Sequence, residues 1–348
     1  MTDLLYSSIE EDLRASVRSL LSDRVDLSRL ESPDPVDLKL WRTLAADLGF
    51  AGLPVPEAAG GAGASWRETA VVMEELGRFV APVPFLGSAV LATAALPADD
   101  PLLPELAGGT RTATLAVPLS TWESPQWTVN AADAHLSGTV TTVADALTAD
   151  VFLVPTTAGL FAVESVKRTP VVSLDLTRPV ADLTFDAAEA RLVAPDASPL
   201  VSRALLAGAA MLASEQLGIA EWCLTTTVEY AKTRRQFARA IGSYQAVKHR
   251  LADLWIAVTE ARAVARYAAD CLANDDPDLP VAASLAQAFC SPVAVKAAEE
   301  CVQLHGGIGF TWEHPAHWYL KRARANAVAL GSAAQHRAHL AGLVDLPA

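Results

Sequence analysis

Apolar residues recur at three- and four-residue spacing through most of the C-terminal half of the chain. The repeat follows residues 206–231 and 247–272, and a third run covers 286–304. A fourth run covers roughly 314–340. A period of 3.6 residues is that of a helix with one buried face. The pattern therefore predicts four long helices joined by short turns, an arrangement that packs as a bundle.

The N-terminal hundred residues predict shorter helices. Residues 13–21 and 38–48 each carry an apolar stripe, and a connector rich in proline and glycine follows at 52–63. The stretch from Trp66 predicts a helix that ends near Gly77, before the prolines at 82 and 84. We therefore expect a helical domain over residues 1–108.

The pattern changes near Arg111 to short runs of Val, Thr, Leu and Phe that are separated by turn residues. Such runs are typical of strands. A linker rich in Pro, Asp and Ser at 195–199 ends this stretch. The sequence thus predicts a small β domain over residues 109–197 and the helical bundle over 198–348.

Composition and charge restrict the function. Of 348 residues, 51% are hydrophobic, so the chain can bury a large core. Asp and Glu number 40 against 27 Lys and Arg, for a net charge of -13 that repels nucleic acid and anionic membranes. Basic residues nevertheless cluster locally, at Lys232, Arg234, Arg235 and Arg239 and again over 321–324. These clusters indicate either binding of a few specific anions, such as phosphates, or two solvated helix faces.

Three sequence features bear on location. The N-terminus is acidic, whereas a secretory signal needs a basic start and an apolar run. The apolar stretch 87–96 is shorter than the roughly 18 residues that span a bilayer. The four cysteines, 223, 271, 290 and 301, have no C-x-x-C spacing and predict buried, reduced thiols. We therefore expect a cytoplasmic protein without a membrane partner.

Two motifs carry the candidate chemistry. QLHGGIGF, at 303–310, ends the third predicted helix with adjacent glycines, which let a planar ring or a pyrophosphate approach the backbone. The same pattern also fits a plain helix end and turn. TRRQF, at 233–237, offers a guanidinium that can pair with two phosphate oxygens. The same residues also fit a plain surface charge beside an aromatic side chain that packs into the core.

Together with IGSYQAVKHRLAD at 241–253, these motifs resemble the acyl-CoA dehydrogenase family. The resemblance implies an α+β fold with an N-terminal helical domain, a middle β-barrel or sheet domain and a C-terminal four-helix bundle. It also implies FAD as cofactor, an acyl-CoA substrate and an electron-transfer flavoprotein as a candidate acceptor. The residues that it places beside the adenosine and pyrophosphate end of the flavin are Arg234, Gln236, Phe237, Gln303, Gly306 and Gly307.

The catalytic base of the family is missing. Most members supply a glutamate from a Tyr-Glu-Gly-Thr stretch that matches 329–332 here, so Leu330 replaces it. Others supply it immediately before an arginine that matches Arg203, where this chain has Ser202. Neither residue accepts a proton at neutral pH. Arg203 remains a candidate contact for CoA or for a partner carboxylate.

A further departure concerns the run that holds the isoalloxazine in the family, where this chain reads PLSTWESPQW at 118–127. Only Ser120 and Thr121 could do part of that work. Groups that serve a neighbour's flavin are therefore kept, and groups that serve the chain's own substrate are lost. This division is similar to the base-lacking β subunit of actinobacterial α2β2 acyl-CoA dehydrogenases, which act with a base-bearing α subunit on steroid-derived CoA thioesters.

Two alternatives stay open at this point. One is an active homo-oligomer with an unrecognised base, for which Glu221 and Glu229 are candidates. The other is an inert scaffold or binding protein of the same fold. No catalytic residue is assigned, and His305, His314 and His317 lack the spacing of metal ligands, so no metal site is expected.

Overall fold

The structure is a computed structural model that describes residues 4–32, 35–123 and 126–344. The N-terminal part is helical. Its α-helices are α1 (Ser8–Arg24), α2 (Leu38–Arg42), α3 (Trp66–Arg78), α4 (Thr93–Ala95) and α5 (Leu102–Ala107), and the π-helical turn η5 (Leu86–Ala92) precedes α4. Ser65 and Glu68 form a capping box that fixes the start of α3.

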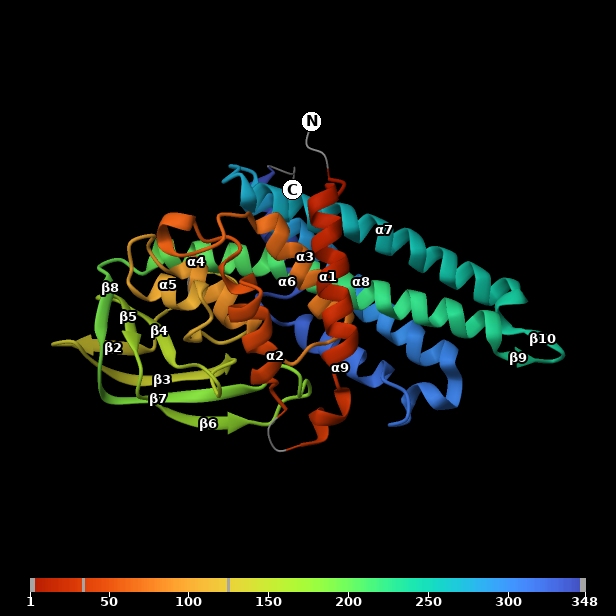
Figure 1. Cartoon of the computed structure of the whole chain (residues 1–348), viewed down its shortest axis with the longest axis horizontal. Coiled ribbons are helices and arrows are strands. Elements are labelled where there is room, and N and C mark those ends of the chain that lie inside the picture. Colours follow the sequence, from red (N-terminus) through yellow and green to blue (C-terminus); the bar gives the residue numbers. More distant parts are fainter. Residues whose placement is uncertain (1–3, 33–34, 124–125, 345–348) are drawn as a thin grey trace.

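Two four-stranded sheets make up the middle of the chain (Figure 1). The first has the order β1 (Ala113–Leu115), β4 (Val151–Thr156), β5 (Gly159–Val163), β8 (Arg191–Ala194), with β1 parallel to β4 and the other pairs antiparallel. The second is antiparallel, in the order β2 (Val129–Ala132), β3 (His135–Ala144), β7 (Val180–Glu189), β6 (Lys167–Val171). Leu136, Phe152 and Leu183 are among the buried residues of their shared core.

The C-terminal part contains three long helices, α6 (Ser198–Thr233), α7 (Gln245–Ala273) and α8 (Leu279–His305). A short hairpin, β9 (Arg235–Gln236) and β10 (Arg239–Ala240), joins α6 to α7. The segment Leu279–Phe310 is apolar and long enough to span a membrane, but 67% of its apolar window is buried inside the protein. A buried helix of this kind is part of the core.

The fourth predicted helix is interrupted, so the prediction of one continuous helix over 314–340 was wrong. The structure has α9 (Ala316–Asn326) and α10 (Ala333–Leu343) instead. Between them, Leu330 and Gly331 adopt φ angles of 51° and 95°. This left-handed backbone cannot continue a right-handed helix. The break positions Leu330 and turns α10 back along α8.

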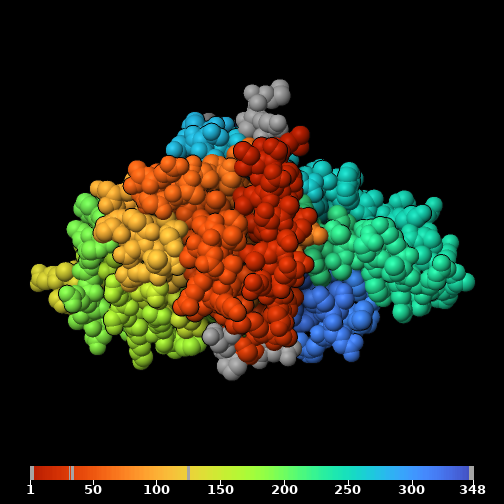
Figure 2. Space-filling model, viewed as in Figure 1, coloured from red at the N-terminus to blue at the C-terminus, as the bar shows by residue number. Residues whose placement is uncertain are grey.

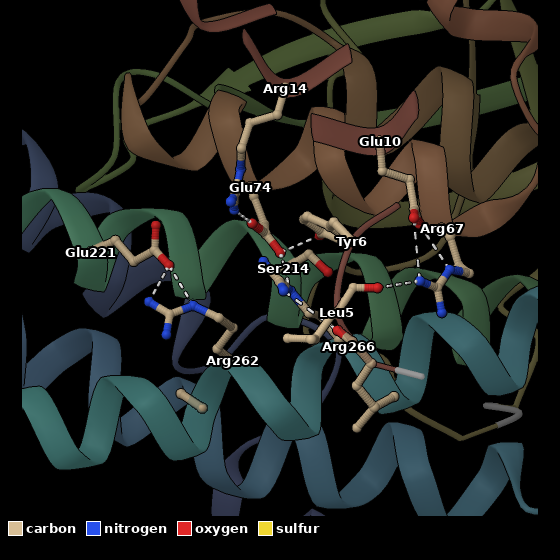
Figure 3. A network of polar contacts seen from close by, with 12 residues as sticks. Leu5, Tyr6, Glu10, Arg14, Arg67, Glu74, Ser214, Glu221, Arg262 and Arg266 are labelled. Carbon is tan, nitrogen blue, oxygen red and sulfur yellow. Dashed lines mark hydrogen bonds and ion pairs between the residues drawn. The ribbon is translucent and has the colours of Figure 1, made fainter. Parts of the chain in front are cut away.

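Buried ion pairs fasten the N-terminal helices to the bundle (Figure 3). Glu74 of α3 is 1% exposed and accepts hydrogen bonds from Tyr6 and Arg14, while Arg266 of α7 lies 3.6 Å from it. Arg67, on the same helix, pairs with Glu10 of α1 and with Asp270 of α7, each at 2.8 Å. These contacts fix α1 and α3 against α7.

A second buried network ties the β6–β7 connection to α6 and α9. Arg178 donates to Glu215 at 2.5 Å and to Asn326 at 2.9 Å, and Asn326 donates to Glu215 at 2.7 Å. Arg322 of α9 lies 3.3 Å from Asp175. Burial alone would favour the neutral carboxyl group, but the guanidinium groups of Arg178 and Arg322 lower the pKa of Glu215 to about 2.

Candidate functional site

Three of the predicted site residues lie where α6 ends. The N–H of Arg234 donates to the carbonyl of Tyr230 at 2.8 Å, and the N–H of Ile241 donates to the carbonyl of Arg234 at 2.8 Å. The chain then turns through the β9–β10 hairpin, with Phe237 and Ala238 at φ angles of 51° and 66°. Arg234 and Gln236 are exposed, and Phe237 is 90% exposed. The hairpin therefore presents a guanidinium and an aromatic ring to the outside.

The other three residues lie where α8 ends. Gln303 is exposed on the last turn of α8, and Gly306, at φ 64°, begins the 3-10 turn η7 (Gly306–Phe310). A Cβ placed on Gly306 or on Gly307 would meet no atom within 4 Å. The paired glycines thus leave open space beside the backbone, where a flat or anionic group can approach.

These two ends lie together. The hydroxyl of Tyr230 donates to the carbonyl of His305 at 3.3 Å, and the two rings stack at 4.4 Å between centroids. Figure 1 places the hairpin and the end of α8 at the same end of the helices, and Figure 2 shows this end projecting from the body of the molecule. The structure therefore brings all six predicted residues to one exposed end.

A polar cluster lies beneath the glycine turn. Nδ1 of His305 is 2.6 Å from the carbonyl oxygen and 3.6 Å from Sγ of Cys301. Burial opposes protonation of His305, but its contacts with Cys301 raise its pKa overall. The four cysteines are free and buried, as predicted. In the described residues no group of three or more His, Cys, Asp or Glu side chains could hold a metal ion.

The two expected base positions face one cavity of about 200 Å³. Leu330 and Ser202 both line it, together with Trp122 and Glu123 from the β domain and His336 and His339 from α10. Leu330 is 1% exposed. Positions from two different parts of the sequence thus converge on the place where the family resemblance expects a base.

Trp122 fills the space beside this cavity. Its ring packs edge-on against His336 and His339, with centroids 5.5 and 5.4 Å apart. A Cβ on Gly331 would come within 2.6 Å of the Cβ of Trp122, so only glycine fits there. The carboxylate of Glu123 lies 3.8 Å from Nδ1 of His339. Pockets for drug-sized ligands measure about 300–1,000 Å³, so the remaining cavity is too small for an acyl-CoA thioester and a flavin ring.

Sequence reasoning missed Trp122, His336 and His339. The stretch 118–127 was recognised as a departure from the family pattern, but nothing in its letters shows that an indole fills the gap. Ser120 and Thr121, which were expected to do part of the flavin-holding work, lie in the turn immediately before this ring.

The remaining candidates lie elsewhere. Arg203 lines a separate cavity of about 270 Å³ with Trp66 and Asp275. Glu221 accepts hydrogen bonds from Arg262 at 2.8 and 3.0 Å, and Glu229 pairs with Lys232 at 2.6 Å. Neither glutamate is among the described residues that line the cavity at Leu330.

A larger cavity, about 830 Å³, lies between α5 and the two sheets. Charged side chains line it, but several are already paired: Arg111 lies 3.0 Å from Glu164, and Arg191 lies 2.8 Å from Asp100. None of the predicted site residues is among its described lining residues. This cavity is therefore separate from the candidate site.

The exposed end fits one half of a FAD molecule. Arg234 forms no ion pair with a carboxylate of the described residues, and the glycine turn beside it is open. A free guanidinium next to exposed backbone suits a pyrophosphate. The stretch that the family resemblance places against the isoalloxazine fits a flavin ring poorly, because the indole of Trp122 packs there against His336 and His339.

Comparison with known proteins gives a consistent result. Residues 7–98 match the family model of the acyl-CoA dehydrogenase N-terminal domain, and residues 199–343 match that of the C-terminal domain. The chain is 37% identical over 327 residues to acyl-CoA dehydrogenase IpdE2 of Mycobacterium tuberculosis, covering 92% of each chain.

Two solved structures resemble the whole chain. A variant of the Tcur3481-Tcur3483 steroid ACAD has a TM-score of 0.86 at 31% identity, covering 97% of this chain and 98% of that one. The ChsE4-ChsE5 complex of Mycobacterium tuberculosis has a TM-score of 0.89 at 28% identity, covering 100% of both chains. The predicted fold class is confirmed.

Proposed function

The chain belongs to the acyl-CoA dehydrogenase family, whose fold binds FAD, and we propose that it is the base-lacking subunit of a heteromeric member. In this role it supplies a half-site for the adenosine and pyrophosphate end of the cofactor. A base-bearing partner subunit, in an α2β2 assembly, supplies the substrate pocket. The observation that carries this proposal is the cavity of about 200 Å³ at Leu330 and Ser202, which has no base at either position and is lined on one side by Trp122.

The chemistry explains why this loss matters. α,β-Desaturation of an acyl-CoA requires a base that removes the α-proton, and loss of a positioned base costs about 10²- to 10⁴-fold in rate. When bound, FAD accepts the hydride that leaves the β-carbon. A buried leucine and a serine cannot take the proton at neutral pH. Turnover by this chain alone is therefore not expected.

At the half-site, the chain's residues bind and orient rather than react. The guanidinium of Arg234 pairs with two phosphate oxygens, with Gln236 beside it. Gly306 and Gly307 allow the backbone to approach the cofactor. Phe237, which projects from the hairpin, packs against the adenine.

The similar complexes support a partner and a substrate class. The names of both structures join two different chains, and one is called a steroid ACAD. We infer a steroid-derived acyl-CoA as the substrate of the assembly and an electron-transfer flavoprotein as its acceptor. The four free, buried cysteines are consistent with a reducing cytoplasmic compartment.

Titration with FAD tests the half-site. The chain is coexpressed with a base-bearing acyl-CoA dehydrogenase encoded nearby, and the apo-complex is titrated. Arg234→Ala leaves a phosphate without its charge-assisted hydrogen bonds, so the dissociation constant for FAD should rise roughly ten- to hundredfold. Arg24→Ala, an exposed arginine at the end of α1, is the control and should change nothing. Equal dissociation constants for wild type and Arg234→Ala would contradict the proposal.

One observation favours a second candidate function, an active homo-oligomer. Glu123 is a carboxylate on the cavity at Leu330, and it is exposed. If it served as the base, the chain purified alone would bind FAD and form an enoyl-CoA product, and Glu123→Gln would abolish this activity. Absence of product from the yellow, isolated wild-type protein eliminates this candidate.

A further inference from the structure

The connection between β6 and β7 exposes apolar side chains. Val172 is 101% exposed, Leu174 is 58% exposed and Leu176 is 37% exposed. Isolated exposed apolar residues are common on protein surfaces. Three at alternate positions of one short loop form a patch, and patches of this kind mark interaction surfaces.

The same loop buries its charges. Asp175 is 1% exposed, accepts a hydrogen bond from the N–H of Thr177 at 2.9 Å and lies 3.3 Å from Arg322. Arg178, at the end of the loop, is 5% exposed and bonded to Glu215. The usual arrangement is thus inverted, with charged side chains inside and apolar ones outside.

This inversion has two physical consequences. Buried ion pairs recover little of their desolvation cost, so these pairs add little to the folding stability of the isolated chain. The buried pairs do hold the backbone in place, so little conformational entropy remains to be lost when the apolar side chains are covered. The loop is therefore pre-organised for a contact with another surface.

The loop contacts α9, the helix that follows the glycine turn along the chain. Arg322, its anchor, belongs to α9, which Figure 1 shows between the sheets and the end of α8. The next residue toward the half-site, Lys321, places Nζ 4.6 Å from the ring centroid of Trp312. Trp312 is 70% exposed, and Phe310, in the glycine turn, is 75% exposed. Contacts thus run from the loop through α9 to the glycine turn.

We propose that the loop 172–176 and the exposed aromatic side chains of Phe310 and Trp312 form one docking surface for the partner subunit that brings its flavin to the half-site. This inference rests on the proposed function, because α9, which anchors the loop, follows the glycine turn that would face the partner's flavin. The matching partner surface is apolar, since Val172, Leu174 and Leu176 carry no charge. Asp175 and Arg322 act as positioning residues that hold the loop in its docking conformation.

Assembly in the absence of FAD tests this surface. The dissociation constant of the complex with the coexpressed partner is measured by analytical ultracentrifugation for wild type, Leu174→Asp and Ile9→Asp. Leu174→Asp places a charge in an apolar contact and should weaken assembly at least tenfold. Ile9→Asp, which changes a 73% exposed residue of α1, should leave it unchanged. Both isolated variants should keep the melting temperature of the wild type, because neither side chain is buried.

The outcomes separate the two proposals. If Leu174→Asp assembles as wild type while Arg234→Ala loses FAD affinity, the docking surface is wrong and the half-site stands. If Leu174→Asp weakens assembly and Arg234→Ala leaves FAD affinity unchanged, the docking surface stands and the half-site is wrong. If the wild-type chain forms no complex with a base-bearing partner, both proposals fail.

Discussion

The backbone N–H of Leu330 donates a hydrogen bond to the carbonyl oxygen of Leu119, at a distance of 2.7 Å. This bond joins the break between α9 and α10 to the segment that carries Trp122. The position where the family resemblance expects a base is therefore an attachment point between the β domain and the helices. The residue at the expected base position and the indole beside the cavity are thus held by the same local structure.

Restoring a carboxylate at this position should not restore activity. Leu330→Glu buries an acidic side chain at a site that is 1% exposed, and we expect a loss of about 2–4 kcal/mol in the free energy of unfolding. Urea denaturation and an acyl-CoA-dependent dye-reduction assay measure both effects. Leu330→Met, which nearly conserves volume, should cost less than about 1.5 kcal/mol. Turnover by the single Leu330→Glu variant would show that Trp122 does not block the site.

The two glycines of η7 should respond differently to alanine. Gly306 has φ 64°, so Gly306→Ala should lower the free energy of unfolding of the isolated chain by about 1–2 kcal/mol. Gly307 has open space and no such backbone constraint, so Gly307→Ala should leave stability unchanged. In the complex, the added methyl group of Gly307→Ala should weaken FAD binding if the cofactor lies against this backbone. A titration that gives wild-type affinity for Gly307→Ala would place the cofactor elsewhere.

Stability should fall in acid through Glu215. Its pKa is about 2 in the folded protein, below the ordinary value of 4.5, so its ionised form favours the folded state. The contribution is complete above pH 4.5 and is lost as the pH falls from 4.5 toward 2, and it amounts to about 3 kcal/mol. Denaturation at a series of pH values should show this decline.

Removing the partner guanidinium provides the control. Arg178→Met leaves Glu215 buried without its closest ion pair, which should cost about 3–5 kcal/mol at neutral pH. The decline between pH 4.5 and pH 2 should then become shallower, because the carboxyl group no longer favours the ionised form as strongly. An unchanged decline in Arg178→Met would assign the acid sensitivity to other carboxyl groups.

The network at Glu74 should control the docking of α1. Glu74→Gln removes the charge that neutralises Arg14 and Arg266, so the free energy of unfolding should fall by about 3 kcal/mol. Limited proteolysis should then cleave near α1 sooner than in wild type. Tyr6→Phe, which removes one hydrogen bond to the same carboxylate, should cost about 1 kcal/mol. Equal proteolysis of Glu74→Gln and wild type would refute this role.

The periodic helices could be predicted from the sequence because local spacing determines which face is buried. The β9–β10 hairpin and the break at Leu330 could not be predicted in this way. Phe237, Ala238 and Leu330 all adopt left-handed φ angles, although none of them is a glycine or an asparagine. The two-residue turn of the hairpin requires the conformations of Phe237 and Ala238. A tertiary contact, the bond from Leu330 to Leu119, holds Leu330.

The candidate site likewise has one part that local sequence motifs predict and one part that they do not. The residues proposed for the half-site lie in two compact motifs whose order along the chain is distinctive, so the family resemblance could suggest them, and the structure brings them to one end of the helices. Trp122 and its histidine neighbours come from segments more than two hundred positions apart, and only the folded chain brings them together. No local pattern links residues at that separation.

The hydrogen bonds that hold the loop 172–176 in place join segments that are far apart in the sequence, and this has a consequence for quality control in the cell. Arg178 reaches Glu215 in α6 and Asn326 in α9, which lies 148 positions further along the chain. The loop can take its final shape only after the last helices have been synthesised and folded. A truncated or misfolded copy would thus lack the docking surface proposed above, and if that surface recruits the partner, assembly itself would select complete subunits.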